Sequence, residues 1–527
     1  MPATSPNGTV HQGTIQTVHS KVKSRYLPSL IAAPILLFLA LAAWAFASPA
    51  GASPDDDFHL ASIWCGLGDR DALCETTGQA DTRMVPEPLL DATCYAFLPE
   101  QSAECWDADA QGLGEAPRLN TAPLYPPLFY GTMSIFASPD VQTSVIAMRL
   151  FNAALYVAMI TAVFIALPRT LRPALVISAL GTIVPLGLFI IPSTNPSSWA
   201  LLSATTVWIS LYGALRSSGR RQLVLAGLAV LGVVIGAGAR ADAAAFALFG
   251  MVLAALLGLR RGRSALVPAV AAGIMIIVCV ALFLSAKQGG AVVNGLPTSN
   301  PPLTTGQHLN NLMGIPMLWT GALGGWGLGW LDTIMPAIVP TLAAATFFGA
   351  FAIGIRRLDL RHAIAVGLTI VALWAVPFVL LAQSRSMVGS DVQPRYLLPL
   401  LVIALGIASL RTNAEVGWRG PRSIAAGAAL SAAALAALHT NINRYTKGID
   451  DVSLDPGVRS EWWWSAAPSP SALLIVGGLA FAGLFAVIVV ALYRESGTRI
   501  VTAHTVNDRE NRPSTAGHRL PDSTPLA

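Results

Sequence analysis

Long apolar stretches recur along the chain, and they constrain its fold more than any other feature of the sequence. The first of them reads LPSLIAAPILLFLALAAWAFA. Stretches of about 18 or more apolar residues are long enough to cross the hydrocarbon core of a bilayer as helices. Hydrophobic residues make up 54% of the 527 residues and charged residues only 12%, whereas soluble domains contain about 25% charged residues. We therefore expect an all-α polytopic membrane protein.

These stretches predict about twelve membrane-spanning helices separated by polar connectors. The first span follows Lys21, Lys23 and Arg25. Its length favours an uncleaved anchor, and the small residues of AFASPAGAS leave a cleaved signal peptide as the alternative. The predicted spans are 27–47, 142–167, 174–191, 198–215, 222–238, 242–259, 265–285, 332–355, 362–382, 396–411, 423–440 and 471–493.

Lysine and arginine gather on one side of the predicted bundle. Most of the 33 basic residues lie in alternate connectors and in the two tails. The positive-inside rule makes that side cytoplasmic, so both termini are predicted to be inside. The tails, 1–26 and 494–527, are polar and predicted to be disordered. The net charge of +5 is dispersed along the chain, so we expect the lipid bilayer as a partner and no nucleic acid.

Three long connectors fall on the opposite, outer side. The first, 48–141, is predicted to form a small extracytoplasmic loop domain. The other two, 286–331 and 441–470, belong to a multi-pass region that covers 142–493. The glycines and tryptophans of 286–331 predict helices that lie in the interface or re-enter the membrane.

Four of the five cysteines lie in the predicted loop domain, which indicates an oxidising compartment and two disulfides. The short spacings favour Cys65–Cys74 and Cys94–Cys105 among the three pairings that are open. A zinc site is the alternative, although no pair has the two-residue spacing typical of zinc ligands. Cys279 lies within a span and is predicted to be a core residue.

The stretch SPDDDFH places Asp55, Asp56 and Asp57 where the chain leaves the first span. A carboxylate beside low-dielectric surroundings has a raised pKa, and it can act as a general base or hold a divalent cation such as Mg or Mn. The same residues also suit a helix start, with serine as the N-cap, proline at the first helical position and acids in the first turn. Both interpretations stay open. His59 is either a substrate contact or a structural hydrogen-bonding group.

Three arginines are predicted on the outer side. Arg395, in QPRYLLPLL, stands where the tenth span begins. Its burial is costly unless it is paired, and its planar fork suits phosphate oxygens; the alternative is that it snorkels to the interface. Arg240 either pairs with Asp242 or faces the same cavity, and Arg385 lies on the loop that leads to Arg395.

Two aromatic motifs complete the candidate site. Two prolines make YPPLFY extended and rigid, so that Tyr125 and Tyr130 either stack on a sugar or anchor the chain at the headgroups. In GWLDT, Trp330 is either a sugar platform or part of an aromatic belt. Asp332 is either a substrate contact or a helix cap.

An apolar first span, an acidic motif in a large first outer loop and many further spans resemble the layout of GT-C-type glycosyltransferases. The finer pattern is similar to a large family of predicted bacterial multi-pass proteins related to that superfamily. SPDDDFH, YPPLFY, GWLDT and QPRYLLPLL carry this resemblance, between about residues 27 and 411. The family often has Glu where this chain has an aspartate.

The resemblance implies an enzyme of the bacterial cytoplasmic (inner) membrane that uses a polyprenyl-phosphate sugar donor and a cell-envelope glycan acceptor. It assigns the role of base or metal ligand to Asp55, Asp56 or Asp57, with Asp56 ranked first. Arg395, with Arg240 or Arg385, is expected to hold the donor phosphate.

Two other classes of protein remain open. One is a transporter or flippase of a lipid-linked or anionic substrate, which needs polar residues deep in several spans; Arg149 and Asn152 are the main ones here. The other is a non-catalytic envelope assembly protein. The absence of Walker, dinucleotide and kinase motifs argues against a cytoplasmic nucleotide enzyme.

Overall fold

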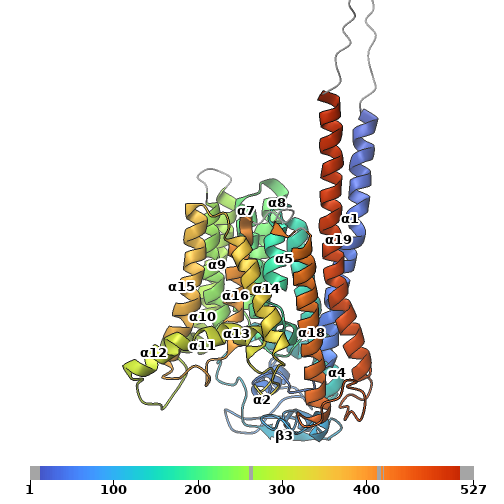
Figure 1. Ribbon diagram of the computed structural model, residues 1–527. Helices are drawn as coiled ribbons and strands as arrows, with labels where there is room; N and C mark the ends of the chain where they lie inside the picture. The colour runs from blue at the N-terminus through green and yellow to red at the C-terminus, as the bar shows by residue number, and fades with distance from the viewer. Residues whose placement is uncertain (1–11, 260–264, 412–416, 419, 511–527) are drawn as a thin grey trace, which may run out of the picture.

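The chain folds into a helical bundle with a small domain at one end, and the computed structural model describes residues 12–259, 265–411, 417–418 and 420–510 (Figure 1). Three short strands are present, together with the 3-10 turn η6 (Pro394–Tyr396). The helices are α1 (Gln12–Phe46), α2 (Asp56–Trp64), α3 (Pro127–Met133), α4 (Val141–Ala166), α5 (Arg172–Leu180), α6 (Leu186–Ile190), α7 (Ser197–Leu215), α8 (Gly219–Ala237), α9 (Ala241–Gly258), α10 (Leu266–Leu284), α11 (Gln288–Asn294), α12 (Thr305–Gly314), α13 (Pro316–Thr320), α14 (Ile338–Gly354), α15 (Leu360–Gln383), α16 (Leu398–Ala408), α18 (Pro421–Lys447) and α19 (Pro470–Glu510).

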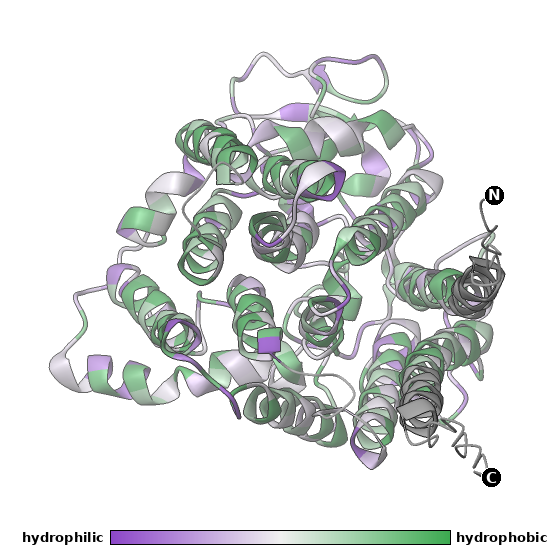
Figure 2. Cartoon of the chain, turned by 90° about the horizontal axis from the view of Figure 1, so that it is seen from above, coloured by the Kyte–Doolittle hydropathy of each residue, from purple (hydrophilic) through white to green (hydrophobic). Residues whose placement is uncertain are grey.

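Nine helices within the described ranges are long and apolar enough to cross a membrane. Two shorter apolar helices, Ile338–Gly354 and Leu398–Arg411, match two more of the predicted spans. Seen from above, hydrophobic residues predominate in the bundle (Figure 2). The nine helices are Pro28–Phe46, Val141–Ala166, Ser197–Leu215, Gly219–Ala237, Ala241–Gly258, Leu266–Leu284, Leu360–Gln383, Pro421–Lys447 and Pro470–Tyr493.

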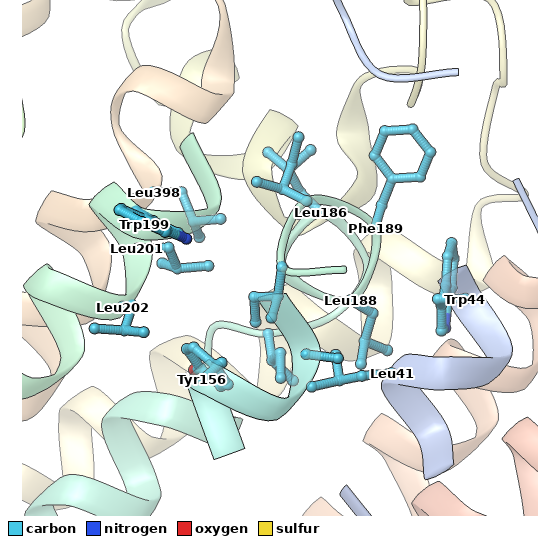
Figure 3. Close-up of a cluster of buried hydrophobic side chains, with 14 of the residues drawn as sticks. Leu41, Trp44, Tyr156, Leu186, Leu188, Phe189, Trp199, Leu201, Leu202 and Leu398 are labelled. Carbon is cyan, nitrogen blue, oxygen red and sulfur yellow. The ribbon is translucent and has the colours of Figure 1, made fainter. Parts of the chain in front are cut away.

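The predicted span 174–191 is not a single helix, so the structure does not confirm a count of twelve. It forms α5 and the short α6, which are separated at Pro185, a residue with no amide hydrogen to continue a helix. The apolar side chains of α6 pack inside the protein, in a cluster of buried hydrophobic residues (Figure 3). Phe189 meets Trp44 of α1 edge to face, with 6.4 Å between the ring centroids.

A buried arginine of α4 fixes the end of α1. Arg149 donates hydrogen bonds to the carbonyls of Ala45 at 3.1 Å, Ser48 at 2.5 Å and Pro49 at 2.7 Å. The last carbonyls of a helix have no partner within it, and they need one when they are buried. Asn152, one turn further along α4, is also hydrogen-bonded inside the bundle. Arg149 and Asn152 therefore both have structural partners.

The chain between α1 and α4 forms the loop domain, and we call this end of the bundle the loop-domain side. Strands β1 (Glu75–Thr76), β2 (Arg83–Pro86) and β3 (Leu113–Ala116) form an antiparallel sheet in that order. The predicted disulfides, Cys65–Cys74 and Cys94–Cys105, are both present. Cys279 is buried in α10, as expected.

The predicted loop 286–331 contains α11, α12 and α13, which lie on the loop-domain side (Figure 1). Helix α12 begins with a capping box, in which Thr304 and Gln307 each bind the other's backbone N–H. Its side chains Leu309 and Met313 are exposed, as in helices that rest on a membrane surface.

The arginine distribution predicts that the loop domain lies outside the cell. Ala80, in the loop domain, and Ser218, at the opposite end of the bundle between α7 and α8, are both exposed. We expect an Ala80→Cys variant to react with a membrane-impermeant maleimide in intact cells, and a Ser218→Cys variant to react only after permeabilisation. The reverse pattern would contradict this orientation.

Candidate functional site

The SPDDDFH stretch does not start its helix as predicted. Helix α2 begins at Asp56, and Asp55 precedes it in the left-handed region with φ 61°. The expected N-cap, Ser53, instead donates its backbone N–H to the Asp56 carboxylate at 3.0 Å. This tight turn sends the three consecutive aspartates to different surroundings, so they have different chemistry.

Asp56 is fully buried and lines neither of the two cavities described below. The Thr194 hydroxyl donates to its two carboxylate oxygens at 3.0 and 3.1 Å. Burial raises the pKa of Asp56 to about 7, although Arg149 and the hydrogen bonds from Ser53 and Thr194 oppose the shift. Asp56 therefore ties α2 to the segment between α6 and α7, and it has no open path to a substrate.

Asp55 faces a cavity and is paired with two arginines. Its carboxylate lies 2.5 Å from Arg395 and 3.5 Å from Arg118. Burial raises the pKa of Asp55, but the charge and hydrogen bond of Arg395 and the charge of Arg118 outweigh this effect and hold the pKa at about 2. Asp55 is thus ionised at neutral pH.

Arg395 is buried in η6, immediately before α16. Besides Asp55 it contacts the carbonyl of Pro54 at 3.1 Å and the hydroxyl of Tyr396 at 3.3 Å. Its Nε has no hydrogen-bond partner among the described residues. Arg395, at the start of the tenth predicted span, therefore contacts the SPDDDFH turn, and its partner Asp55 lies 340 residues earlier in the chain.

Arg240 approaches the same place from the turn between α8 and α9. It forms a bidentate pair with Asp242, with N–O distances of 2.8 and 2.6 Å. Its guanidinium also lies 5.8 Å from the ring centroid of Tyr125 and 5.3 Å from that of Tyr396. Of the two alternatives for Arg240, the structure shows the pair with Asp242; Arg240 lines neither of the two cavities described below.

His59 is buried next to Tyr125 and Tyr130. His59 Nδ1 and the Tyr130 hydroxyl share a hydrogen bond of 2.8 Å, and the Tyr125 ring lies 5.3 Å from the imidazole. Burial lowers the pKa of His59 to about 3, and the charges of the nearby arginines act in the same direction. The imidazole is therefore neutral. Its Nε2 is buried and has no partner in the described part of the chain.

Sequence analysis missed Arg118, which connects the loop domain to this cluster. It pairs with Asp57 as well as with Asp55, and its guanidinium lies 5.8 Å from the Phe58 ring centroid. Nothing in the sequence distinguishes Arg118 from its polar neighbours. Its partner Asp57 lies 61 residues earlier in the chain. Only the fold of the loop domain brings it here.

Asp55 and Arg395 line two different cavities. The larger, of about 260 Å³, has a mixed polar and apolar lining made by Asp55, Phe58, Asp81, Pro117, Arg118, Leu119, Thr121, Leu124 and Tyr125. The smaller, of about 20 Å³, is rich in glycine and apolar side chains and is lined by Pro54, Leu186, Gly321, Gly327, Leu328, Gly329, Leu331, Gln393, Pro394 and Arg395. Asp55 and Arg395 thus each face a different opening.

Three of the predicted site residues make their contacts elsewhere. Arg385 is exposed and donates to the carbonyl of Asn300 at 3.0 Å. Trp330 donates its indole N–H to the carbonyl of Gly51 at 2.9 Å. Asp332 pairs with Arg444 at 2.7 Å. None of the three lines the larger cavity.

The sequence left open a divalent cation at this site, and few side chains here could bind one. Among the residues that the structure describes, no three His, Cys, Asp or Glu side chains are grouped so that they could hold a metal ion. Asp55 and Asp57 are both engaged by arginines. Among the described residues, the carboxylates of this site are therefore partners of arginines and are not grouped as metal ligands.

The bundle and this arginine-rich site define a polytopic membrane protein with a cluster of charged residues next to a disulfide-bonded loop domain. The chain belongs to the family described as "Predicted membrane protein (DUF2142)", whose model matches residues 38–404. That range contains every residue of the cluster around Asp55 and Arg395. Comparison with curated proteins and with solved structures gives no match.

The Asp332–Arg444 pair is predicted to stabilise the fold. Both side chains are buried, and Arg444 also donates to the carbonyls of Tyr95, Leu98 and Gln101 in the loop domain. Removing one partner of a buried ion pair costs about 3–5 kcal/mol, so Asp332→Ala should clearly lower the unfolding temperature in detergent.

The matched control is Asp451→Ala, because the Arg459–Asp451 pair is exposed. Exposed pairs contribute about 0–1 kcal/mol. Equal losses of stability in the two variants would contradict the structural role of Asp332.

Asp56 is predicted to make stability depend on pH. Its pKa rises on folding from 3.8 to about 7, so the folded chain binds the proton more tightly than the unfolded chain. The contribution to the free energy of unfolding is then fully present below about pH 4 and is lost as the pH rises towards 7. Unfolding temperatures in detergent across this range should fall less steeply for Asp56→Asn than for the wild type. An unchanged slope in that variant would show that Asp56 does not titrate there.

Proposed function

We propose that this protein is a GT-C-type glycosyltransferase of the bacterial cytoplasmic membrane. It moves a sugar from a polyprenyl-phosphate donor to a cell-envelope glycan acceptor on the outer face, where the loop domain lies. The observation that carries the proposal is the contact between the Asp55 carboxylate and the Arg395 guanidinium, which lie 2.5 Å apart. Asp55 lines the larger cavity and Arg395 lines the smaller one. This transfer requires one group that accepts the acceptor's proton and one group that binds the donor phosphate.

Arg395 is the donor-phosphate ligand in this proposal. It lines the smaller, glycine-rich cavity, which has room for about one water molecule, so a donor phosphate must widen this cavity to reach the guanidinium. A guanidinium binds phosphate oxygens through two parallel hydrogen bonds. Arg240 and Arg395 both lie close to Tyr396, with their guanidinium groups 5.3 and 5.2 Å from the centroid of its ring. The second cation adds to the positive field that stabilises a departing phosphate.

Asp55 is the base in this proposal. The acceptor oxygen attacks the anomeric carbon of the donor, the bond between that carbon and the phosphate oxygen breaks, and the acceptor proton passes to Asp55. The polyprenyl phosphate leaves with the bonding electrons and stays beside Arg395.

The pairing of Asp55 explains how a weak base becomes competent. In the free protein two arginines hold its pKa at about 2, which makes it a poor proton acceptor. A donor phosphate that takes over Arg395 removes the main favourable charge on Asp55, and the burial that raises its pKa then dominates. Donor binding thus strengthens the base before the acceptor reacts.

The other aspartates fit this role less well. Asp56 was ranked first from sequence, but it is buried and hydrogen-bonded to Thr194 and Ser53. Asp57 is paired with Arg118 and does not line either cavity. Only Asp55, among the three, is placed beside both an opening and Arg395.

The interior of the bundle offers less support for transport. A transporter needs polar groups in its spans that are available to a substrate. Arg149 and Asn152, the main sequence candidates, are occupied by backbone and side-chain partners.

Asp55→Asn is predicted to abolish transfer without unfolding the protein. Asparagine tolerates the left-handed conformation that Asp55 adopts, but it cannot accept a proton as a carboxylate does. Loss of a general base slows chemistry by about 10²–10⁴-fold. The measurement is transfer by purified protein from a short-chain polyprenyl-phosphate sugar, together with envelope glycan and lipid-carrier analysis of a deletion strain carrying the variant.

The matched control is Asp57→Asn, which removes the neighbouring charge in the same turn and should retain most of the activity. The deletion strain should accumulate the lipid-linked donor and make a truncated glycan. Normal glycan from the Asp55→Asn variant would rule out the proposed mechanism.

A further inference from the structure

We infer that the larger cavity, between α2 and the rest of the loop domain, is the acceptor subsite, and that it takes an uncharged glycan end and rejects acidic sugars. This inference rests on the proposed function, because it names the second substrate of the same site. We call this cavity the loop-domain cleft and define it by its lining residues Asp55, Phe58, Asp81, Pro117, Arg118, Leu119, Thr121, Leu124 and Tyr125.

The location of the cleft matches the needs of an acceptor. Asp55, the proposed base, lines it directly, so a hydroxyl bound there lies beside the group that takes its proton. Arg395 lines the other cavity instead. A lipid phosphate at Arg395 and a hydroxyl in the cleft therefore lie in different cavities and do not compete for the same space.

The lining of the cleft suits a sugar. Carboxylate oxygens of Asp55 and Asp81 and the hydroxyl of Thr121 can hydrogen-bond sugar hydroxyls. Phe58 and Tyr125 supply apolar ring surfaces with their centroids 5.7 Å apart. The volume of about 260 Å³ is close to the lower end of the range for small-molecule sites, about 300–1,000 Å³. The cleft therefore fits the end of a glycan and not a long stretch of one.

The charges of the cleft exclude an acidic acceptor. Arg118 is its only cationic lining residue, and it is already paired with Asp55 and Asp57. Asp81 is exposed and has no ion pair or hydrogen bond from its carboxylate among the described residues. A uronic acid or a sugar phosphate in the cleft would thus lie near the carboxylates of Asp55 and Asp81, while the charge of Arg118 is already neutralised. Repulsion between like charges would weaken the binding of such an acidic ligand.

Two variants of the full chain, purified in detergent, test this inference. Thr121→Trp places a large ring in the cleft and should abolish glycan binding. Asp81→Lys reverses one charge and should lower the preference for neutral over acidic glycans by about tenfold or more. Asp109→Lys is the matched control, since Asp109 is also an exposed aspartate of the loop domain but does not line the cleft.

Binding is read on an array of neutral and uronic-acid oligosaccharides, and binding of a short-chain polyprenyl phosphate is measured separately. The expected result is that the wild type binds neutral glycans only, and that Thr121→Trp loses them while it still binds the lipid phosphate. Acidic glycans bound as well as neutral ones, no glycan bound at all, or loss of the lipid phosphate together with the glycans would overturn the inference.

Transfer activity separates this inference from the proposed function. If Thr121→Trp transfers sugar at the wild-type rate, the acceptor does not use the cleft, and the inference fails while the enzyme stands. If the wild type binds neutral glycans in the cleft but transfers nothing from any polyprenyl-phosphate sugar, the subsite stands and the glycosyltransferase proposal fails.

Discussion

The site depends on how the chain is held where it leaves α1. Buried backbone carbonyls at a helix end need donors, and Arg149 of α4 supplies them to Ala45, Ser48 and Pro49. A few residues later, the carbonyl of Pro54 accepts hydrogen bonds from both Asn195 and Arg395. The turn that carries the aspartates is therefore fixed by side chains from three distant segments of the bundle, and its geometry follows from theirs.

That fixed turn gives consecutive aspartates separate roles. Asp56 points into the protein and bonds to Thr194, whereas Asp55, in a left-handed conformation, points to the arginines and the loop-domain cleft. A regular helix start would have placed both in one solvated first turn. The difference between a raised pKa of about 7 and a lowered one of about 2 arises because one carboxylate is buried with a distant cation and the other is in direct contact with one.

Sequence reasoning predicted much of the bundle because apolar length and the hydrocarbon core leave a chain few choices. It also predicted both disulfides from spacing. It failed for 174–191, since an apolar segment reads the same whether it faces lipid or, as α6 does, the protein core. It named Asp55, His59, Tyr125, Tyr130, Arg240 and Arg395, which the fold brings together, and also Trp330, Asp332 and Arg385, which make their contacts elsewhere.

The sequence by itself determined that this chain is a helical membrane protein with a disulfide-bonded loop domain and a set of charged residues at the ends of its apolar segments. Only the tertiary structure decided which of those charges meet. Asp55 and Arg395 are 340 residues apart, and Arg118 lies in a polar stretch with no distinguishing pattern. Hydropathy is a property of local composition, so it can be read along the chain. An ion pair depends on the relative positions of whole segments, and those are set by packing and by the need to satisfy buried polar groups.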